Sequence, residues 1–327
     1  MTASTFRAEH TTAGLVPAQG AYGAPATPSG FRYPSLTTTV PKELVHRAAV
    51  AEVMLTDWWR EGETRFAMQG QWPRGHSFFT PVAGHHDPLI AAETIRQAGI
   101  LLAHAEFGVP LGHQFLVSDL DVTVDPRHMI VGDTPASLDI TVDCPDVRMR
   151  GTSLAGLRIA VEIRRDGEIA ARGGGALASI APPVYRRLRG ARADAMQRVL
   201  PLTAPAAPQL VGRMSPTDVT LTPVGEADRW QLRVDTRHPV LFDHPLDHVP
   251  GMLLMEAARQ AAAAALRRPV MLPLSITNEF LHYVELDAPC MIEARRDPSR
   301  DDRVTVSAYQ DDAVVFRSTV VAARIDG

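Results

Sequence analysis

An apolar stretch interrupted by charged residues constrains this chain more than any other feature. It runs from Met252 to Ala265 and is apolar almost all the way round a helix. A helix of that kind is buried inside a domain. Glu256, Arg259 and Gln260 nevertheless lie within it, at spacings that place them on one helix face. Because burying these groups unpaired is costly, the fold has to supply partners for that face.

The same motif, charged residues within an apolar stretch, occurs a second time, earlier in the chain. Glu93, Arg96 and Gln97 precede their counterparts by a constant offset, since 256−93, 259−96 and 260−97 all give 163. His85 and His248 share this offset and lie just before the two apolar stretches. We interpret the pattern as an internal duplication, with one repeat in each half of the chain.

Composition narrows the class of protein. The 327 residues suffice for two domains, and 33 basic against 37 acidic residues give a net charge of −4, which argues against a nucleic-acid binder. We find no apolar run long enough to cross a membrane and no secretory signal at the start. The two cysteines, Cys144 and Cys290, make neither a disulfide framework nor a four-ligand zinc site. These features favour a cytoplasmic enzyme.

The chain divides into four segments. Residues 1–38 are rich in Ala, Thr, Gly, Ser and Pro and predict a disordered arm. Residues 39–180 form the first repeat and residues 211–327 the second. Residues 181–210 predict a linker, whose basic run at 185–192 we interpret as solvated in preference to a docking site for an acidic carrier protein.

Each repeat predicts one central helix followed by a run of strands. Asp87-Pro88 supplies a cap and a first-turn proline for a helix ending near Phe107, and Pro250-Gly251 begins the second helix. Alternating apolar positions predict strands at 114–124, 137–142, 154–165 and 169–180, and again at 276–283, 290–295, 304–309 and 314–324. The predicted class is α+β, with an antiparallel sheet wrapped around one long helix in each repeat.

A first resemblance concerns the second apolar stretch. The pattern His-Pro…Pro-Gly-x-x-x-x-Glu-x-x-x-Gln is similar to the signature of the hot-dog-fold dehydratases of fatty-acid synthesis, and here it falls on His244, Pro250, Gly251, Glu256 and Gln260. In that family the histidine and the glutamate act on an acyl thioester. The interval from His244 to Pro250 is two residues short, so His248 is a rival for the role of the histidine.

A closer resemblance, over residues 40–325, is to the AfsA family of γ-butyrolactone signal synthases of actinomycetes. The phrases that carry it are Val45-His46, Glu52–Asp57, Trp72–His76, Asp87–Gln97 and Val109–Gly112 in the first repeat, and Asp243–Gln260 in the second. The resemblance implies a double hot-dog fold, in which the two repeats pair as a pseudo-dimer with active sites between them. Further association of that pseudo-dimer into a homo-oligomer is left open.

The resemblance also implies an activity. The family transfers a β-ketoacyl group from acyl carrier protein to a hydroxyl of dihydroxyacetone phosphate, and the ester closes by aldol condensation to a butenolide phosphate. No cofactor is implied. Two alternatives stay open, a hot-dog dehydratase or thioesterase that needs no phosphate, and a non-catalytic regulatory protein that binds acyl carriers.

Acyl transfer to an alcohol needs a base, donors for an oxyanion and a group that holds the phosphate. Glu256, buried in an apolar helix, is expected to have a raised pKa that suits a general base, unless it serves only as ion-pair partner of Arg259. Arg259 is expected either to hold the phosphate or to pair with that glutamate. The first helical N–H groups, near Gly251 and Met252, are expected to polarise the thioester carbonyl.

The first repeat offers a sister site, but Asp87-Pro88 replaces the Pro-Gly pair there, so we expect the chemistry in the second repeat with Glu93 as a participant. The histidines lie at no established ligand spacing, and we expect no metal. The predicted catalytic residues are Glu256, Arg259, His244 and Glu93. The predicted substrate-binding residues are Gly251, Met252, Arg96, Gln260, Gln97 and His248.

Overall fold

The computed structural model describes residues 37–192 and 198–323. The predicted N-terminal arm, residues 1–38, falls almost wholly outside the described residues, as does the middle of the predicted linker. Residues from Thr38 onward cluster as one unit by their contacts. Across the described part of the chain, each helix is too short or too polar to cross a membrane.

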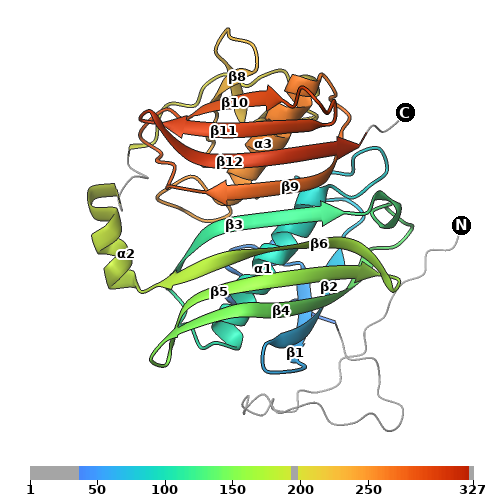
Figure 1. The fold of residues 1–327 in the computed structure, drawn as a ribbon, viewed down its shortest axis with the longest axis vertical. Helices are drawn as coiled ribbons and strands as arrows, with labels where there is room; N and C mark the ends of the chain where they lie inside the picture. Colours follow the sequence, from blue (N-terminus) through green and yellow to red (C-terminus); the bar gives the residue numbers. More distant parts are fainter. Residues whose placement is uncertain (1–36, 193–197, 324–327) are drawn as a thin grey trace, which may run out of the picture. The chain divides into compact units, whose positions relative to one another are not determined.

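The two repeats contain the same elements in the same order (Figure 1). In the first repeat these are β1 (Leu55–Arg60), β2 (Arg65–Trp72), α1 (Pro88–Ala105), β3 (Gln114–Val124), β4 (Ala136–Arg150), β5 (Ser153–Arg165) and β6 (Glu168–Ile180). In the second they are β7 (Leu221–Pro223), β8 (Arg229–Leu232), α3 (Gly251–Leu266), β9 (Leu272–Phe280), β10 (Met291–Arg296), β11 (Arg303–Gln310) and β12 (Ala313–Ala323). A short helix, α2 (Pro182–Arg189), connects the repeats.

The strands form one twelve-stranded antiparallel sheet with a palindromic order, β1-β2-β4-β5-β6-β3-β9-β12-β11-β10-β8-β7. Its centre is the pairing of β3 with β9, which runs from Asp119 opposite Glu279 to Thr123 opposite Ser275. Helix α1 packs on the strands of the first repeat and α3 on those of the second, both behind the sheet in Figure 1. The predicted double hot-dog architecture is therefore confirmed.

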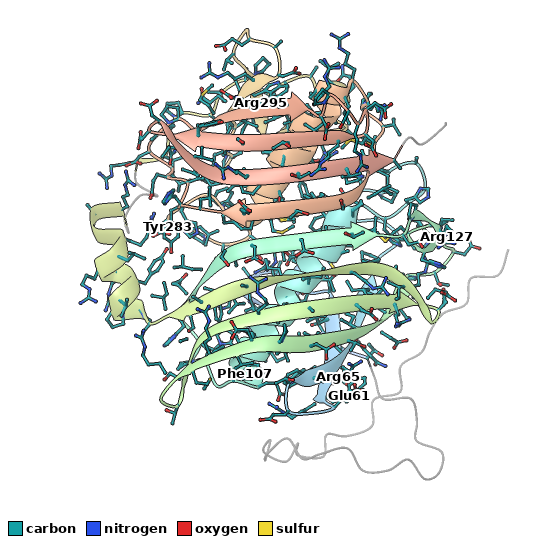
Figure 2. All side chains as sticks on the ribbon, viewed as in Figure 1. Glu61, Arg65, Phe107, Arg127, Tyr283 and Arg295 are labelled. Carbon is teal, nitrogen blue, oxygen red and sulfur yellow. The ribbon has the colours of Figure 1, made fainter. Side chains whose placement is uncertain are left out.

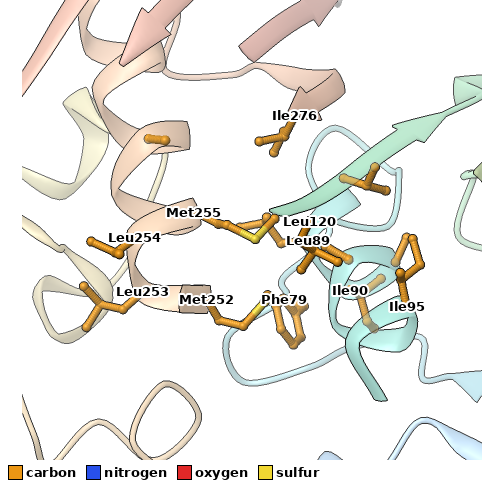
Figure 3. Close-up of a cluster of buried hydrophobic side chains, with 14 of the residues drawn as sticks. Phe79, Leu89, Ile90, Ile95, Leu120, Met252, Leu253, Leu254, Met255 and Ile276 are labelled. Carbon is orange, nitrogen blue, oxygen red and sulfur yellow. The ribbon is translucent and has the colours of Figure 1, made fainter. Parts of the chain in front are cut away.

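Both helices start where the sequence predicts, for different local reasons. The Asp87 carboxylate caps α1 by accepting a hydrogen bond from the Leu89 amide at 3.0 Å, and Pro88 occupies the first turn. Helix α3 starts after Pro250, which provides no side-chain cap. The N-terminal halves of the two helices face each other through Leu89 and Met255, within one continuous apolar core (Figure 3).

The strand predictions hold with two shifts of boundary. Strand β4 extends to Arg150, beyond the predicted end at 142, and its last residues are mostly exposed. They continue the backbone pairing with β5, but most of their side chains are exposed, so no alternating apolar pattern marks them. Strand β9 starts at Leu272, four residues before the predicted start. The region around Val45 forms two 3₁₀ turns, Lys42–Val45 and Val50–Glu52.

Candidate active site

The Glu256 carboxylate, fully buried in α3, is clamped by two guanidinium groups. Arg259 donates from Nε to Oε2 at 2.9 Å and from Nη2 to Oε1 at 2.7 Å. Arg213 donates in the same bidentate way at 2.7 and 2.6 Å, and Gln260 donates to Oε1. The ion pair with Arg259, one of the two expectations for that residue, is thus present.

This clamp corrects the expected pKa of Glu256. Burial alone would raise it, but the positive charges of Arg213 and Arg259 outweigh burial and hold the pKa at about 2. Desolvation without the bidentate guanidinium groups of Arg213 and Arg259 would give the raised pKa that the sequence predicts. A carboxylate with so low a pKa is a weak base, and we therefore assign Glu256 an electrostatic and structural role.

The first repeat builds the same clamp around Glu93. Arg96 donates to both carboxylate oxygens at 2.9 and 2.8 Å, and Arg47 donates from Nε at 2.9 Å with its Nη2 2.7 Å from Oε2. Gln97 adds a bond of 2.7 Å. Burial again opposes the charge, but the two arginines hold the pKa of Glu93 at about 2. The duplicated motif therefore folds into a duplicated salt cluster.

The second arginine of each cluster was not among the predicted site residues. Arg47 and Arg213 are separated by 166 positions, so a search at the offset of 163 passes over them. Both follow a valine by two residues, in Val45-His-Arg and Val211-Gly-Arg, and this short repeat was the available signal. Each arginine comes from the segment before the first strand of its repeat and reaches back to the central helix.

The two glutamines tie those segments to the helices. Gln97 accepts from the Met54 amide at 2.9 Å and donates to the Glu52 carbonyl at 2.7 Å. Gln260 makes the equivalent pair of bonds, with the Thr220 amide at 3.0 Å and the Asp218 carbonyl at 2.7 Å. Both side-chain amides are therefore engaged within the protein, and their predicted contact with substrate stays a prediction.

Each cluster is completed by a loop of the other repeat. Arg47 donates to the Val240 carbonyl at 3.0 Å and lies 3.6 Å from Asp243, both in the second repeat. Arg213 donates to the Phe78 carbonyl at 2.6 Å and lies 3.5 Å from Asp87, both in the first. The structure therefore brings the loop of Asp243 and His244 to the Glu93 cluster, whereas Glu256 of the same repeat faces Asp87.

His244 forms an acid–imidazole dyad in that loop. Its Nδ1 lies 2.5 Å from Oδ1 of Asp243, whose other oxygen accepts from the Ala48 amide at 2.9 Å. Burial would raise the pKa of Asp243, but the bond to His244 and the charge of Arg47 lower it. The ionised carboxylate orients the ring with Nδ1 as donor, and the His244 side chain is 38% exposed. Its Nε2 is thus suited to accept a proton from a bound molecule.

The two clusters differ in access from solvent. The Arg259 side chain is 2% exposed, but the Arg96 side chain is 18% exposed. Arg96 also donates to the Val45 carbonyl at 3.3 Å, which fixes the guanidinium in place. A guanidinium that is fixed and partly exposed suits an incoming phosphate better than one that is fully enclosed.

His248, the rival histidine, belongs to a separate network around Asp247. Its Nδ1 lies 2.6 Å from Asp247, which also accepts from the Tyr185 hydroxyl at 2.7 Å and from Arg189 at 2.9 Å. Arg189 further binds both oxygens of Glu285 at 2.7 Å. Strong pairing with these donors keeps the pKa of Asp247 below its usual range despite its burial.

This network corrects the prediction of a solvated linker. Tyr185 and Arg189 lie on α2, and Arg189 is buried. Its Cζ atom is 4.4 Å from the ring centroid of Tyr283, which Figure 2 labels beside α2. Arg186 and Arg187 of the same helix remain exposed. The segment is therefore an anchored helix with a basic outer face, and the sequence showed only its charge.

The start of α3, where the sequence predicts a carbonyl-binding site, has no side-chain cap. Pro250 gives no side-chain cap, so the N–H groups of Gly251 and Met252 lack the kind of carboxylate partner that Asp87 provides in α1. A Cβ at position 251 would lie 3.0 Å from the Phe280 ring, tighter than ordinary van der Waals contact. Glycine therefore permits the close packing of this helix start.

Other reactive side chains have structural surroundings. Burial raises the pKa of Cys144 and Cys290 to about 12, so neither thiol supplies a thiolate at neutral pH. His76 accepts from two loop amides, those of Phe78 and Phe79. Within residues 37–192 and 198–323, His, Cys, Asp and Glu side chains form no group of three or more with the arrangement of a metal site.

The fold and the paired clusters define a double hot-dog protein with sites built across its two repeats. The chain belongs to the AfsA family, whose model, the A-factor biosynthesis hotdog domain, matches residues 32–179 and 195–327.

Known proteins extend this likeness over most of the chain. A 2-oxo-3-(phosphooxy)propyl 3-oxoalkanoate synthase of Streptomyces virginiae is 54% identical over 284 residues, covering 86% of this chain and 96% of that protein. The protein of the same name from Streptomyces coelicolor is 40% identical over 292 residues, covering 88% and 93%. Among solved structures, an acyl-ACP thioesterase from Bacteroides thetaiotaomicron covers 79% of this chain and 98% of its own at a TM-score of 0.49 and 11% identity.

Proposed function

We propose that this protein is an acyltransferase that condenses a 3-oxoacyl thioester with dihydroxyacetone phosphate. The product is a 3-oxoacyl ester that cyclises to a butenolide phosphate. Two relatives that match nearly their whole length are named 2-oxo-3-(phosphooxy)propyl 3-oxoalkanoate synthase, which describes such an ester. The observation that carries the proposal to particular residues is the meeting of the His244 dyad of one repeat with the Glu93 cluster of the other.

We divide the acyl transfer between the His244 dyad and the first N–H groups of α3. Nε2 of His244 accepts the proton of the attacking hydroxyl, and Asp243 stabilises the imidazolium that forms. The N–H groups of Gly251 and Met252 bind the oxyanion of the tetrahedral intermediate. When the C–S bond breaks, His244 returns its proton to the departing thiolate, which leaves the ester, the free thiol and a neutral histidine.

The phosphate is assigned to Arg96. This guanidinium is held by Glu93 and by the Val45 carbonyl, and its partial exposure leaves donors for an incoming dianion. Glu93 contributes by orienting Arg96 and Arg47, since its low pKa makes it a weak base. Glu256 and Arg259 perform the same structural task in the second repeat, enclosed from solvent.

We further propose that the acyl group arrives on an acyl carrier protein that docks on α2. Val184 and Leu188 are exposed one helical turn apart, at 46% and 58%, with Arg186 and Arg187 exposed beside them. A small apolar patch within a basic face complements an acidic protein surface. Arg189 ties this helix to Asp247, four residues before the start of α3, so docking is coupled to the loop of His244 and His248.

The test is a mass-spectrometric assay of the full protein with a 3-oxoacyl carrier-protein thioester, with and without dihydroxyacetone phosphate. We expect a phosphorylated ester or butenolide only when the phosphate compound is present, and its loss in His244→Asn. His282→Asn, at an exposed position outside the site, is the matched control. Hydrolysis or dehydration that ignores the phosphate compound would favour a hot-dog thioesterase or dehydratase. Carrier binding without turnover would favour a non-catalytic regulator.

A further inference from the structure

A pair of histidines occurs at the Glu93 cluster and has no equivalent in the other repeat. Nε2 of His46 lies 2.8 Å from Nε2 of His104, and Nδ1 of His104 lies 2.7 Å from the Val109 carbonyl. The counterparts in the second repeat are Gly212, at the same offset as the paired arginines, and Arg267, at the offset of the helices. The two repeats therefore differ at this histidine contact, although both keep the salt cluster.

The hydrogen bonds determine which nitrogen atoms carry protons. A carbonyl oxygen only accepts hydrogen bonds, so Nδ1 of His104 carries the hydrogen. In the neutral ring, Nε2 of His104 is then unprotonated and can only accept. Nε2 of His46 must then donate to it. That leaves Nδ1 of His46 as an unprotonated nitrogen, with no hydrogen-bond partner among the residues that the structure describes. The relay from Val109 through His104 thus presents His46 as a free acceptor.

The backbone at His46 is held in a conformation that glycine would adopt more easily. Its φ is 51°, in the left-handed region, and the corresponding Gly212 has a φ of 69°. Such positions in non-glycine residues are strained and concentrate at functional sites. The residues on either side bind the cluster, since Val45 accepts from Arg96 and Arg47 clamps Glu93. The imidazole is thereby fixed against the cluster at a conformational cost that the second repeat avoids.

We propose that His46 is a second proton acceptor of the active site, and that it acts when a phosphate monoester is bound at the neighbouring Arg96 guanidinium. This inference rests on the proposed function and deepens it. The step is the enolisation that cyclisation needs. The C–H bond between the two carbonyls of the 3-oxoacyl group breaks, an N–H bond forms at Nδ1 of His46, and the electron pair stays on the substrate as an enolate.

The charges around His46 explain the switch. In the unliganded protein, burial lowers the pKa of His46 most, the positive charge of Arg96 comes next, and the neighbouring His104 and His244 rings act in the same direction, so that the pKa is about 3. The remaining charged neighbours of the cluster, Arg47 with Glu93 and Asp243, are already paired with one another. A phosphate dianion bound at Arg96 opposes the positive charge that suppresses protonation of His46, so His46 gains basicity only when the acceptor substrate is present.

The direct test is nuclear magnetic resonance of the full protein labelled with ¹⁵N-histidine. Without ligand at neutral pH, we expect His46 protonated at Nε2 only. Saturating dihydroxyacetone phosphate should raise its titration midpoint by about three pH units, towards neutrality, and dihydroxyacetone without phosphate should leave it unchanged. A hydrogen on Nδ1 in place of Nε2, or a midpoint unmoved while the His244 signals report binding, would overturn the proposal. Absence of any binding would instead overturn the proposed function, and the switch with it.

Kinetic variants separate proton transfer from folding. His46→Gly matches the residue of the other repeat and relieves the strained φ, so we expect a folded protein with kcat reduced at least about tenfold. His104→Gln can accept from His46 and donate to Val109, and it should keep kcat, whereas His104→Phe should lower kcat with little change in KM for dihydroxyacetone phosphate. Wild-type kcat in His46→Gly, or equal kcat in both His104 variants, would refute the relay.

Discussion

Glu256→Gln tests the conclusion that the buried glutamates are anchors whose charge stabilises the fold. The substitution keeps the shape of the side chain and leaves Arg213 and Arg259 buried without their shared counter-ion. Removing one partner of a buried ion pair typically destabilises a protein by about 3–5 kcal/mol. We therefore expect the free energy of unfolding to fall by about that amount, a large part of the roughly 5–15 kcal/mol available to a domain.

The pKa gives an independent magnitude. The pKa of Glu256 is about 2 in the fold, against 4.5 for an unperturbed glutamate. A difference of this size corresponds to about 3 kcal/mol of stabilisation by the ionised form. Because the folded pKa is the lower one, this contribution is complete above pH 4.5 and is lost as the pH falls towards 2. The wild type should therefore lose stability across that window, and the variant should lose less.

The assay is urea denaturation at neutral pH and across that acidic window. Glu93→Gln tests the equivalent cluster and should behave alike, and Glu279→Gln on exposed β9 is the control, expected within about 0.5 kcal/mol of wild type. A Glu256→Gln protein within about 1 kcal/mol of wild type, with the same acid sensitivity, would refute the assignment of Glu256 as a charged anchor.

Three further predictions concern the reaction. His244→Asn should lower kcat at least about a hundredfold, because the proton acceptor is lost, whereas His282→Asn should match wild type in the same mass-spectrometric assay. Arg96→Gln should raise KM for dihydroxyacetone phosphate about tenfold or more by removing a charge-assisted phosphate contact; an unchanged KM would place the phosphate elsewhere. Arg186→Glu with Arg187→Glu should slow turnover of the carrier-bound thioester and spare a free pantetheine thioester, and equal losses on both substrates would argue against docking on α2.

Much of the fold could be predicted from the sequence because the repeats are regular. The constant offset between Glu93 and Glu256 revealed the duplication, and the local signals Asp87-Pro88 and Pro250-Gly251 located the helix starts. The strands alternate because one face covers a helix, so period two is visible wherever that face is buried. The end of β4 runs beyond the core, and there the pattern gives no signal.

The site was less predictable because its chemistry depends on contacts between distant segments. Arg47 lies 46 positions from Glu93, and Arg213 lies 43 positions from Glu256. Neither pairing follows a helical or strand periodicity in the sequence. Without these arginines, the pKa of a buried glutamate is expected to be raised, whereas in the structure it is lowered. The family resemblance implied sites between the repeats, but the local sequence does not show that Asp243 and His244 lie beside the Glu93 cluster.

The β3–β9 pairing has a consequence for how such a site can change over time. In a dimer of two identical chains, every substitution appears twice, so the two sites are bound to remain copies of each other. Here the sheet is continuous but the halves are encoded separately. One half can keep His46 and His104 while the other holds Gly212 and Arg267. Because the two repeats are encoded in tandem, the site of one repeat can change while the other repeat keeps the fold that supports it.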